Sequence, residues 1–154
     1  MYFRIDRTQS RIPNSILVYR PQEYSFDVEP SPEGSFTSVL LDDLNLEVDE
    51  AGKVISVWGL CPHTRWSPAN LCAPEAVSGE LFVVPDGPLM PGISVRLTRG
   101  SYLPVQVDKA TGWVCIGSRE SSAAAVTVFP GVIFELSEQG QITALWLKPH
   151  RGLQ

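Results

Sequence analysis

Cys61 and His63 are the residues whose types and spacing suggest chemistry most directly. An imidazole that reaches a cysteine sulfur can activate it as a nucleophile, and a Cys-x-His pair with two further cysteines can bind zinc. Cys72 and Cys115, however, do not form the paired ligand clusters typical of zinc sites. The competing interpretation is structural, with Cys115 as a small core residue and Cys61 at the end of a buried strand. We expect no catalytic site, no metal site and no cofactor.

Other catalytic patterns are missing from the sequence as well. It contains no nucleophile-elbow, HExxH, phosphate-loop or dinucleotide-binding glycine motif. Asp42 and Asp43 are adjacent carboxylates, but successive residues of a strand point to opposite faces, so the two form a poor acid/base dyad. An enzyme that uses Cys61 and His63 is therefore only the third hypothesis for this chain, and we expect a protein that is not an enzyme.

Two similar stretches, residues 44–63 and 132–150, organise the chain. In each, alternating apolar residues lead into a turn with a glycine, and a second apolar run ends in Trp, Leu, Pro and His. Glycine favours chain reversal, so each stretch is predicted to form a β-hairpin. The similarity has two interpretations that the sequence leaves open: an internal duplication, or two hairpins that meet the same physical demands.

The rest of the sequence predicts a mainly β fold. Its 12 glycines and 13 prolines are spread along the 154 residues, which is typical of many short elements joined by turns. No helical periodicity persists over three turns, and the best helical candidates, 74–77 and 121–125, are single turns. We predict one β-rich domain spanning residues 1–154, with nine to eleven strands. Its architecture is an antiparallel β-sandwich or partly open β-barrel built from hairpins, with at most one or two short helical turns.

Strand alternation also predicts which side chains face the core. Trp58, Trp113 and Trp146 lie inside predicted strands and are expected to be core anchors. The segment 93–98 alternates cleanly, which predicts a strand with Ile93 and its alternate neighbours facing inward.

The net charge of −5 has one source along the chain. Residues 31–63 hold six carboxylates and one lysine, whereas the remaining segments are balanced. The acidic residues are Glu33, Asp42, Asp43, Glu47, Asp49 and Glu50, and the lysine is Lys53. A concentrated negative surface repels nucleic acid and attracts cationic proteins. A basic protein partner is thus expected and a nucleic acid is not, although the carboxylates would equally solvate a turn and protect a sheet edge.

The long segment 61–77 follows the acidic hairpin and has no sustained periodicity. Such loops are often functional. Arg65 and Trp66 have the composition of an interaction hot spot, although Trp66 would alternatively fold back as a lid over the sheet. Together with the hairpin they form the predicted partner-binding surface. Its members are Asp42, Asp43, Glu47, Asp49, Glu50, Arg65 and Trp66.

The acidic segment and the string WGLCPHTRW give the chain a general resemblance to the immunity proteins that bacteria encode beside toxins. The resemblance implies a non-catalytic inhibitor that covers a cationic toxin domain, with carboxylates steering the encounter and an aromatic anchor slowing dissociation. The alternative is a small-ligand or carbohydrate-binding β-sandwich, with Trp66, His63 and His150 lining a concave site.

The sequence gives two expectations about cellular location. No apolar run approaches the roughly 18–20 residues that a spanning helix needs, and the N-terminus lacks a signal-peptide core. Three cysteines, an odd number, fit reduced thiols better than a disulfide framework. We expect a cytoplasmic protein without membrane contact, and the sequence does not predict its oligomeric state.

Overall fold

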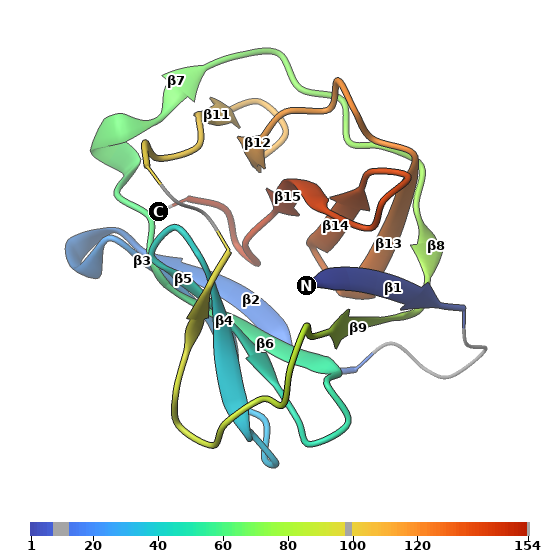
Figure 1. Cartoon of the computed structure of the whole chain (residues 1–154). Helices are drawn as coiled ribbons and strands as arrows, with labels where there is room; N and C mark the ends of the chain where they lie inside the picture. Colours follow the sequence, from blue (N-terminus) through green and yellow to red (C-terminus); the bar gives the residue numbers. More distant parts are fainter. Residues whose placement is uncertain (8–12, 98–99, 154) are drawn as a thin grey trace.

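Two mainly antiparallel β-sheets face each other across the core, and a two-stranded ribbon lies against them (Figure 1). The computed structural model describes residues 1–7, 13–97 and 100–153. The prediction of a mainly β fold built from hairpins is confirmed, and the sheets do not close into a barrel. None of the helical turns in the described ranges has the length and apolarity needed to cross a bilayer.

The six-stranded sheet has the order β10-β4-β5-β6-β3-β2. Its strands are β2 (Ile16–Arg20), β3 (Ser25–Glu29), β4 (Thr37–Leu41), β5 (Leu44–Val48), β6 (Val54–Leu60) and β10 (Val95–Arg96). The seven-stranded sheet has the order β7-β11-β12-β15-β14-β13-β8. Its strands are β7 (Ser67–Pro68), β8 (Val77–Ser78), β11 (Val105–Asp108), β12 (Trp113–Gly117), β13 (Ala124–Phe129), β14 (Val132–Leu136) and β15 (Ile142–Leu147). The ribbon pairs β1 (Tyr2–Asp6) with β9 (Glu80–Val84).

The two large sheets contain the same five-stranded repeat. Strands β2 to β6 occur in the order β4-β5-β6-β3-β2, and strands β11 to β15 in the order β13-β14-β15-β12-β11. Equivalent positions also carry equivalent pairs, since Leu46 lies opposite Val57 as Phe134 lies opposite Leu145, and all four are fully buried. The similarity of the two hairpins thus extends to five strands, which favours duplication over convergence.

The ribbon joins the two repeats symmetrically. Phe3 pairs with Val83; the Phe3 N–H donates to the Gly140 carbonyl at 2.8 Å, and the Val83 N–H donates to the Gly52 carbonyl at 2.9 Å. Gly52 and Gly140 are the equivalent turn glycines, with φ of 86° and 79°. This reciprocal bonding defines a pseudo-twofold axis that passes through the ribbon.

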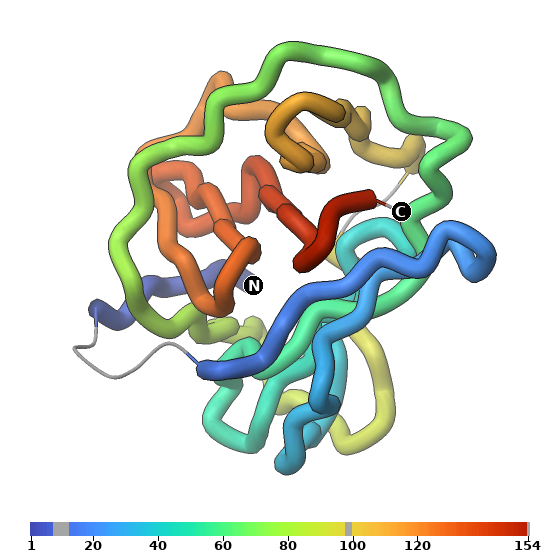
Figure 2. Tube along the Cα trace, turned by 180° about the vertical axis from the view of Figure 1, so that it is seen from behind, coloured from blue at the N-terminus to red at the C-terminus, as the bar shows by residue number. Residues whose placement is uncertain are grey.

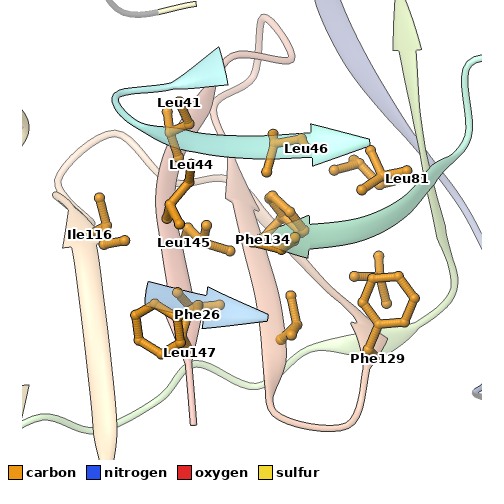
Figure 3. Close-up of a cluster of buried hydrophobic side chains, with 14 of the residues drawn as sticks. Phe26, Leu41, Leu44, Leu46, Leu81, Ile116, Phe129, Phe134, Leu145 and Leu147 are labelled. Atoms are coloured by element: carbon orange, nitrogen blue, oxygen red, sulfur yellow. The ribbon is translucent and has the colours of Figure 1, made fainter. Parts of the chain in front are cut away.

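One hydrophobic core fills the space between the sheets and draws on both repeats (Figure 3). Phe26 and Leu46 come from the six-stranded sheet, and Phe134 and Leu145 come from the seven-stranded sheet. Each side chain of this size contributes about 1.5–3 kcal/mol when fully buried. The core therefore holds both repeats in one unit.

The segment 61–78, which we call the strap, covers the outer face of the seven-stranded sheet (Figures 1 and 2). Its strand β7 pairs in parallel with β11 at one edge, and β8 pairs in parallel with β13 at the other. Between them Leu71, Ala73 and Ala76 pack against a second buried cluster that includes Trp146. The apparent loop is therefore in large part a structural cover.

The strap explains why one prediction about tryptophan was wrong. Trp146 is buried at 1% exposure, as predicted, and Trp113 packs edge-on against it. Trp58 occupies the equivalent position in the first repeat but is 42% exposed, because the strap covers only the second repeat. Strand alternation predicts which side chains share one face of a sheet with Trp58. It does not predict whether another segment of the chain covers that face.

Two further local predictions were wrong. Only Val95–Arg96 of the segment 93–98 forms a strand, which pairs in parallel with β4; Ile93 is 59% exposed, and Thr98 lies outside the described residues. The helical candidates 74–77 and 121–125 are not helical, and both end in strands. Within the described part of the chain, 3₁₀ turns lie instead at Pro21–Glu23 and His63–Arg65.

Candidate functional site

The candidate site is a pocket of about 310 Å³ at one end of the sandwich, which we call the hairpin-end pocket. The turn between β4 and β5, the end of β6, the start of the strap and the segment before β11 form its walls. Its lining residues are Leu41, Asp42, Asp43, Leu44, Leu60, Cys61, Pro62, Arg65, Trp66, Ser67, Tyr102, Leu103, Pro104, Val105, Gln106 and Ile116. Most of these are apolar, and the charged groups come from the β4–β5 turn and the strap.

The acidic turn is held in place by the segment that precedes β11. Asp42 has φ of 52°, in the left-handed region that a two-residue hairpin turn requires. Its carboxylate accepts a hydrogen bond from the Leu103 N–H at 3.0 Å, and the Tyr102 hydroxyl donates to the Asp43 carboxylate at 2.9 Å. Arg96 donates to the Asp42 carbonyl at 3.2 Å. The two carboxylates are thereby fixed in the pocket wall.

Arg65 and Trp66, from the start of the strap, also line the pocket. The 3₁₀ turn His63–Arg65 places the Arg65 guanidinium over the Tyr102 ring, 4.7 Å from its centroid. Trp66 is half-buried; its ring is stacked with Phe26 at 6.0 Å and tilted against Tyr19 at 4.9 Å. Trp66 is thus a lid over the sheet, the second of the two interpretations drawn from the sequence, and it is also part of the pocket wall.

The Trp66 indole N–H lacks a well-formed hydrogen bond. Its Nε1 is buried and has no hydrogen-bond partner with good geometry. An unmet buried donor costs about 1–3 kcal/mol, so such groups are uncommon in folded proteins. The donor faces the Cys61 thiol, where its interaction lowers the thiol's pKa against the larger effect of burial.

Cys61 and His63 do not form an activated pair. Burial raises the pKa of the Cys61 thiol to about 11, so the sulfur is protonated at neutral pH. The His63 Nδ1 lies 3.3 Å from the Tyr19 hydroxyl, which itself donates to the Cys61 carbonyl at 2.9 Å. Burial also raises the pKa of Tyr19 to about 12. These groups form a structural network around Trp66.

Alkylation should distinguish the three thiols. Cys72 is exposed, whereas Cys61 and Cys115 are buried, and burial raises the pKa of both to about 11. Because the thiolate is the reacting form, iodoacetamide should modify Cys72 at neutral pH and leave the other two largely unmodified, as peptide mass spectrometry would show. Rapid modification of Cys61 in the folded protein would contradict this description of the pocket wall.

The structure divides the predicted acidic residues between two ends of the hairpin. Asp42 and Asp43 form the β4–β5 turn, while Asp49 and Glu50 lie in the β5–β6 turn, about 20 Å away along the strand. Glu47 lies between them and accepts a hydrogen bond from Trp58 Nε1 at 3.0 Å. The acidic residues therefore do not form one continuous exposed patch.

Four of the seven predicted binding residues come together in the pocket, and three do not. Asp42, Asp43, Arg65 and Trp66 line it, whereas Glu47, Asp49 and Glu50 are elsewhere on the hairpin. Sequence reasoning missed Tyr102, which touches both Asp43 and Arg65. Its only signal in the sequence was an aromatic residue directly after Gly100 and Ser101.

The described residues contain no group of three or more His, Cys, Asp or Glu side chains arranged to hold a metal ion. His150 does not join His63 and Trp66; it lines a different hollow. No family model matches the chain, and no curated protein sequence matches it significantly.

Proposed function

We propose that the protein is a non-catalytic binding module whose ligand is a small molecule with an aromatic or apolar body and one positively charged group. The observation that carries the proposal is the lining of the hairpin-end pocket. It combines apolar side chains with two carboxylates held by hydrogen bonds and with a tryptophan. Its volume of about 310 Å³ is at the small end of the range typical of ligand sites.

The lining indicates how such a ligand would be held. Leu44, Leu103 and Ile116 offer apolar surface, and Trp66 offers an aromatic face for an apolar ring. A cation near Asp43 would gain a charge-assisted hydrogen bond, which is worth more in an apolar pocket than in water. Because Arg65 balances part of the acidic charge, the pocket suits one cationic group better than several.

A fluorescence titration tests this proposal. Phenethylamine, an aromatic ring with one ammonium group, would be added to a Trp58→Phe variant, in which the exposed indole no longer contributes to the signal. We expect a saturable change in tryptophan emission. Asp43→Asn should weaken the affinity about tenfold or more, since one charge-assisted hydrogen bond is lost.

Glu50→Gln provides the matched control, because it removes an exposed carboxylate at the other end of the same hairpin. It should leave the affinity unchanged. No saturable change, or equal weakening in both variants, would contradict a ligand site in the hairpin-end pocket.

A basic protein, such as a toxin domain, is the second candidate ligand at the same pocket. The observation that favours it is the exposure of two large apolar residues on the pocket wall, Tyr102 at 57% and Leu60 at 53%. Exposed aromatic residues beside charged groups are typical of interaction hot spots. The pocket would then accept a cationic side chain of that protein, in line with the resemblance to immunity proteins.

Binding to the purified product of a neighbouring gene would test this second candidate. Neutralising Asp42 and Asp43 together should slow association, and the effect should shrink at high salt, because exposed charges steer encounters. Neutralising Asp49 and Glu50 should have little effect. Association that is independent of both pairs and of salt would count against a cationic partner.

A further inference from the structure

The pseudo-twofold axis relates the hairpin-end pocket to a second hollow of about 390 Å³. The β13–β14 turn at Pro130 and Gly131 takes the place of Asp42 and Asp43, and Leu17 takes the place of Val105. The lining residues are Ile16, Leu17, Thr111, Gly112, Pro130, Gly131, Lys148, Pro149, His150, Arg151 and Gly152. We call this hollow the basic pocket.

The two equivalent pockets have opposite charge. Among the described residues, the basic pocket is lined by Lys148, His150 and Arg151 and by no carboxylate side chain. Across the described ranges, the Arg151 side chain makes no hydrogen bond or ion pair. Lys148 is exposed as well, with its Nζ 5.7 Å from the centroid of the Trp113 ring, and it forms no ion pair with a carboxylate of the described residues. Two cations at the rim of an apolar hollow are suited to bind an oxyanion.

Two carboxylates that lie close to lining residues, one in sequence and one across the sheet, are engaged elsewhere. Asp108 precedes Thr111, and its side chain accepts hydrogen bonds from the Leu71, Ala110 and Thr111 amides. These amides, Leu71 foremost, lower the pKa of Asp108. Glu29 lies opposite Ile16 in the sheet, and its carboxylate accepts a hydrogen bond from the Arg20 guanidinium. Neither carboxylate lines the basic pocket or neutralises its cations.

Backbone hydrogen bonds fix the walls of the basic pocket. The Lys148 N–H donates to the Gly131 carbonyl at 2.8 Å, and the His150 N–H donates to the Leu17 carbonyl at 2.7 Å. Gly131 has φ of 77°, and a Cβ there would lie 2.3 Å from the carbonyl oxygen of Lys148, the residue that follows β15, so only glycine permits this close approach. The C-terminal segment is thus anchored to the six-stranded sheet.

A third hollow connects the regions of the two pockets. It is lined by Tyr19 and Val107, which are equivalent residues of the two repeats, so it lies at the pseudo-twofold axis. It shares Trp66 with the hairpin-end pocket, and Gly112 and Gly152 with the basic pocket. Both pockets therefore open at the same end of the molecule.

We infer that the basic pocket binds an oxyanion group, a phosphate or a carboxylate, through Lys148 and Arg151. The inference stands on this pocket alone and does not require a ligand in the hairpin-end pocket. A charged oxygen acceptor would form charge-assisted hydrogen bonds with both cations, and the planar guanidinium matches an oxyanion in a bidentate arrangement.

Two NMR titrations of the full chain test the inference, one with inorganic phosphate and one with succinate, at low and constant ionic strength. We expect saturable amide shifts at Gly131 and Gly152 with at least one probe. A response to phosphate alone identifies a phosphoryl ligand, and a response to succinate identifies a carboxylate ligand. Arg151→Gln and Lys148→Gln should each raise the dissociation constant about tenfold.

Lys109→Gln is the matched control, because Lys109 lines the third hollow and not the basic pocket. It should leave the dissociation constant unchanged. Absence of saturable shifts with both anions, or equal affinity of native and Arg151→Gln protein, would overturn the inference. The response of Asp43→Asn to phenethylamine is measured separately, so failure at one pocket is distinguished from failure at the other.

Discussion

Replacing Glu135 with alanine should lower the free energy of unfolding by about 3 kcal/mol, since one buried and one part-buried hydrogen bond to a charged acceptor are lost. Glu135 is 2% exposed and accepts from Trp146 Nε1 at 2.8 Å and from Arg119 Nε at 3.1 Å. Alanine would leave the Trp146 N–H unsatisfied beneath the strap. Urea denaturation followed by fluorescence would measure the change.

The first repeat supplies the control for this prediction. Glu47 accepts a hydrogen bond from Trp58 Nε1 at 3.0 Å, the same cross-strand pair in an exposed setting. Water replaces the lost partner there, so Glu47→Ala should cost less than about 1 kcal/mol. Equal losses in the two variants would show that the strap does not bury the second pair as described.

The second large effect is expected for Gly117→Ala, which should cost about 3 kcal/mol or more. Gly117 has φ of 104°, and a Cβ there would lie 2.3 Å from the Thr143 carbonyl oxygen and 3.1 Å from the Ala144 Cα. Both obstacles are backbone atoms of β15, so the sheet itself would have to shift. Thermal or urea unfolding would report the loss.

Gly34→Ala separates the two destabilising effects in Gly117→Ala, which are the strain of a positive φ and the clash of the new Cβ with β15. Gly34 has φ of 92°, but a Cβ there would meet nothing within 4 Å. Only the backbone strain remains, which is worth about 1–2 kcal/mol. A Gly117→Ala variant as stable as Gly34→Ala would contradict the close approach of β12 and β15.

Local sequence patterns predicted the hairpins well, because turn glycines and apolar alternation act over a few residues. Gly52 and Gly140 take the positive φ that a reversal requires, and the strands on either side pair as expected. The same patterns could not predict which outer face is covered. Trp58 and Trp146 occupy equivalent strand positions, and only the path of the strap makes one exposed and the other buried.

The candidate site was predictable only in part. Arg65 and Trp66 were placed near the acidic hairpin because they follow it in sequence, and both do line a pocket with Asp43. From the sequence, the carboxylates were predicted to form one surface. Strand β5 separates them, because Asp43 precedes the strand and Asp49 follows it. Tyr102 reaches the site through tertiary packing, and no local pattern reports such a contact.

The basic pocket illustrates the same limit. Lys148 and Arg151 belong to a segment in which acidic and basic residues balance, so the sequence gives no sign of a basic site there. Their relation to Asp42 and Asp43 emerges only from the pseudo-twofold axis, which requires the pairing of all five strands in each repeat. The difference in charge between the two equivalent pockets can therefore be recognised only once the fold is known.

Crystallographic fragment screening tests most directly the claim that the hairpin-end pocket is a ligand site. The library would contain aromatic amines, neutral aromatics and aromatic acids in equal numbers. We predict that amines occupy the hairpin-end pocket preferentially, with the ring against Trp66 and the ammonium group at Asp43. Fragments distributed over other faces, such as the one around Trp58, with the hairpin-end pocket empty throughout, would contradict the claim.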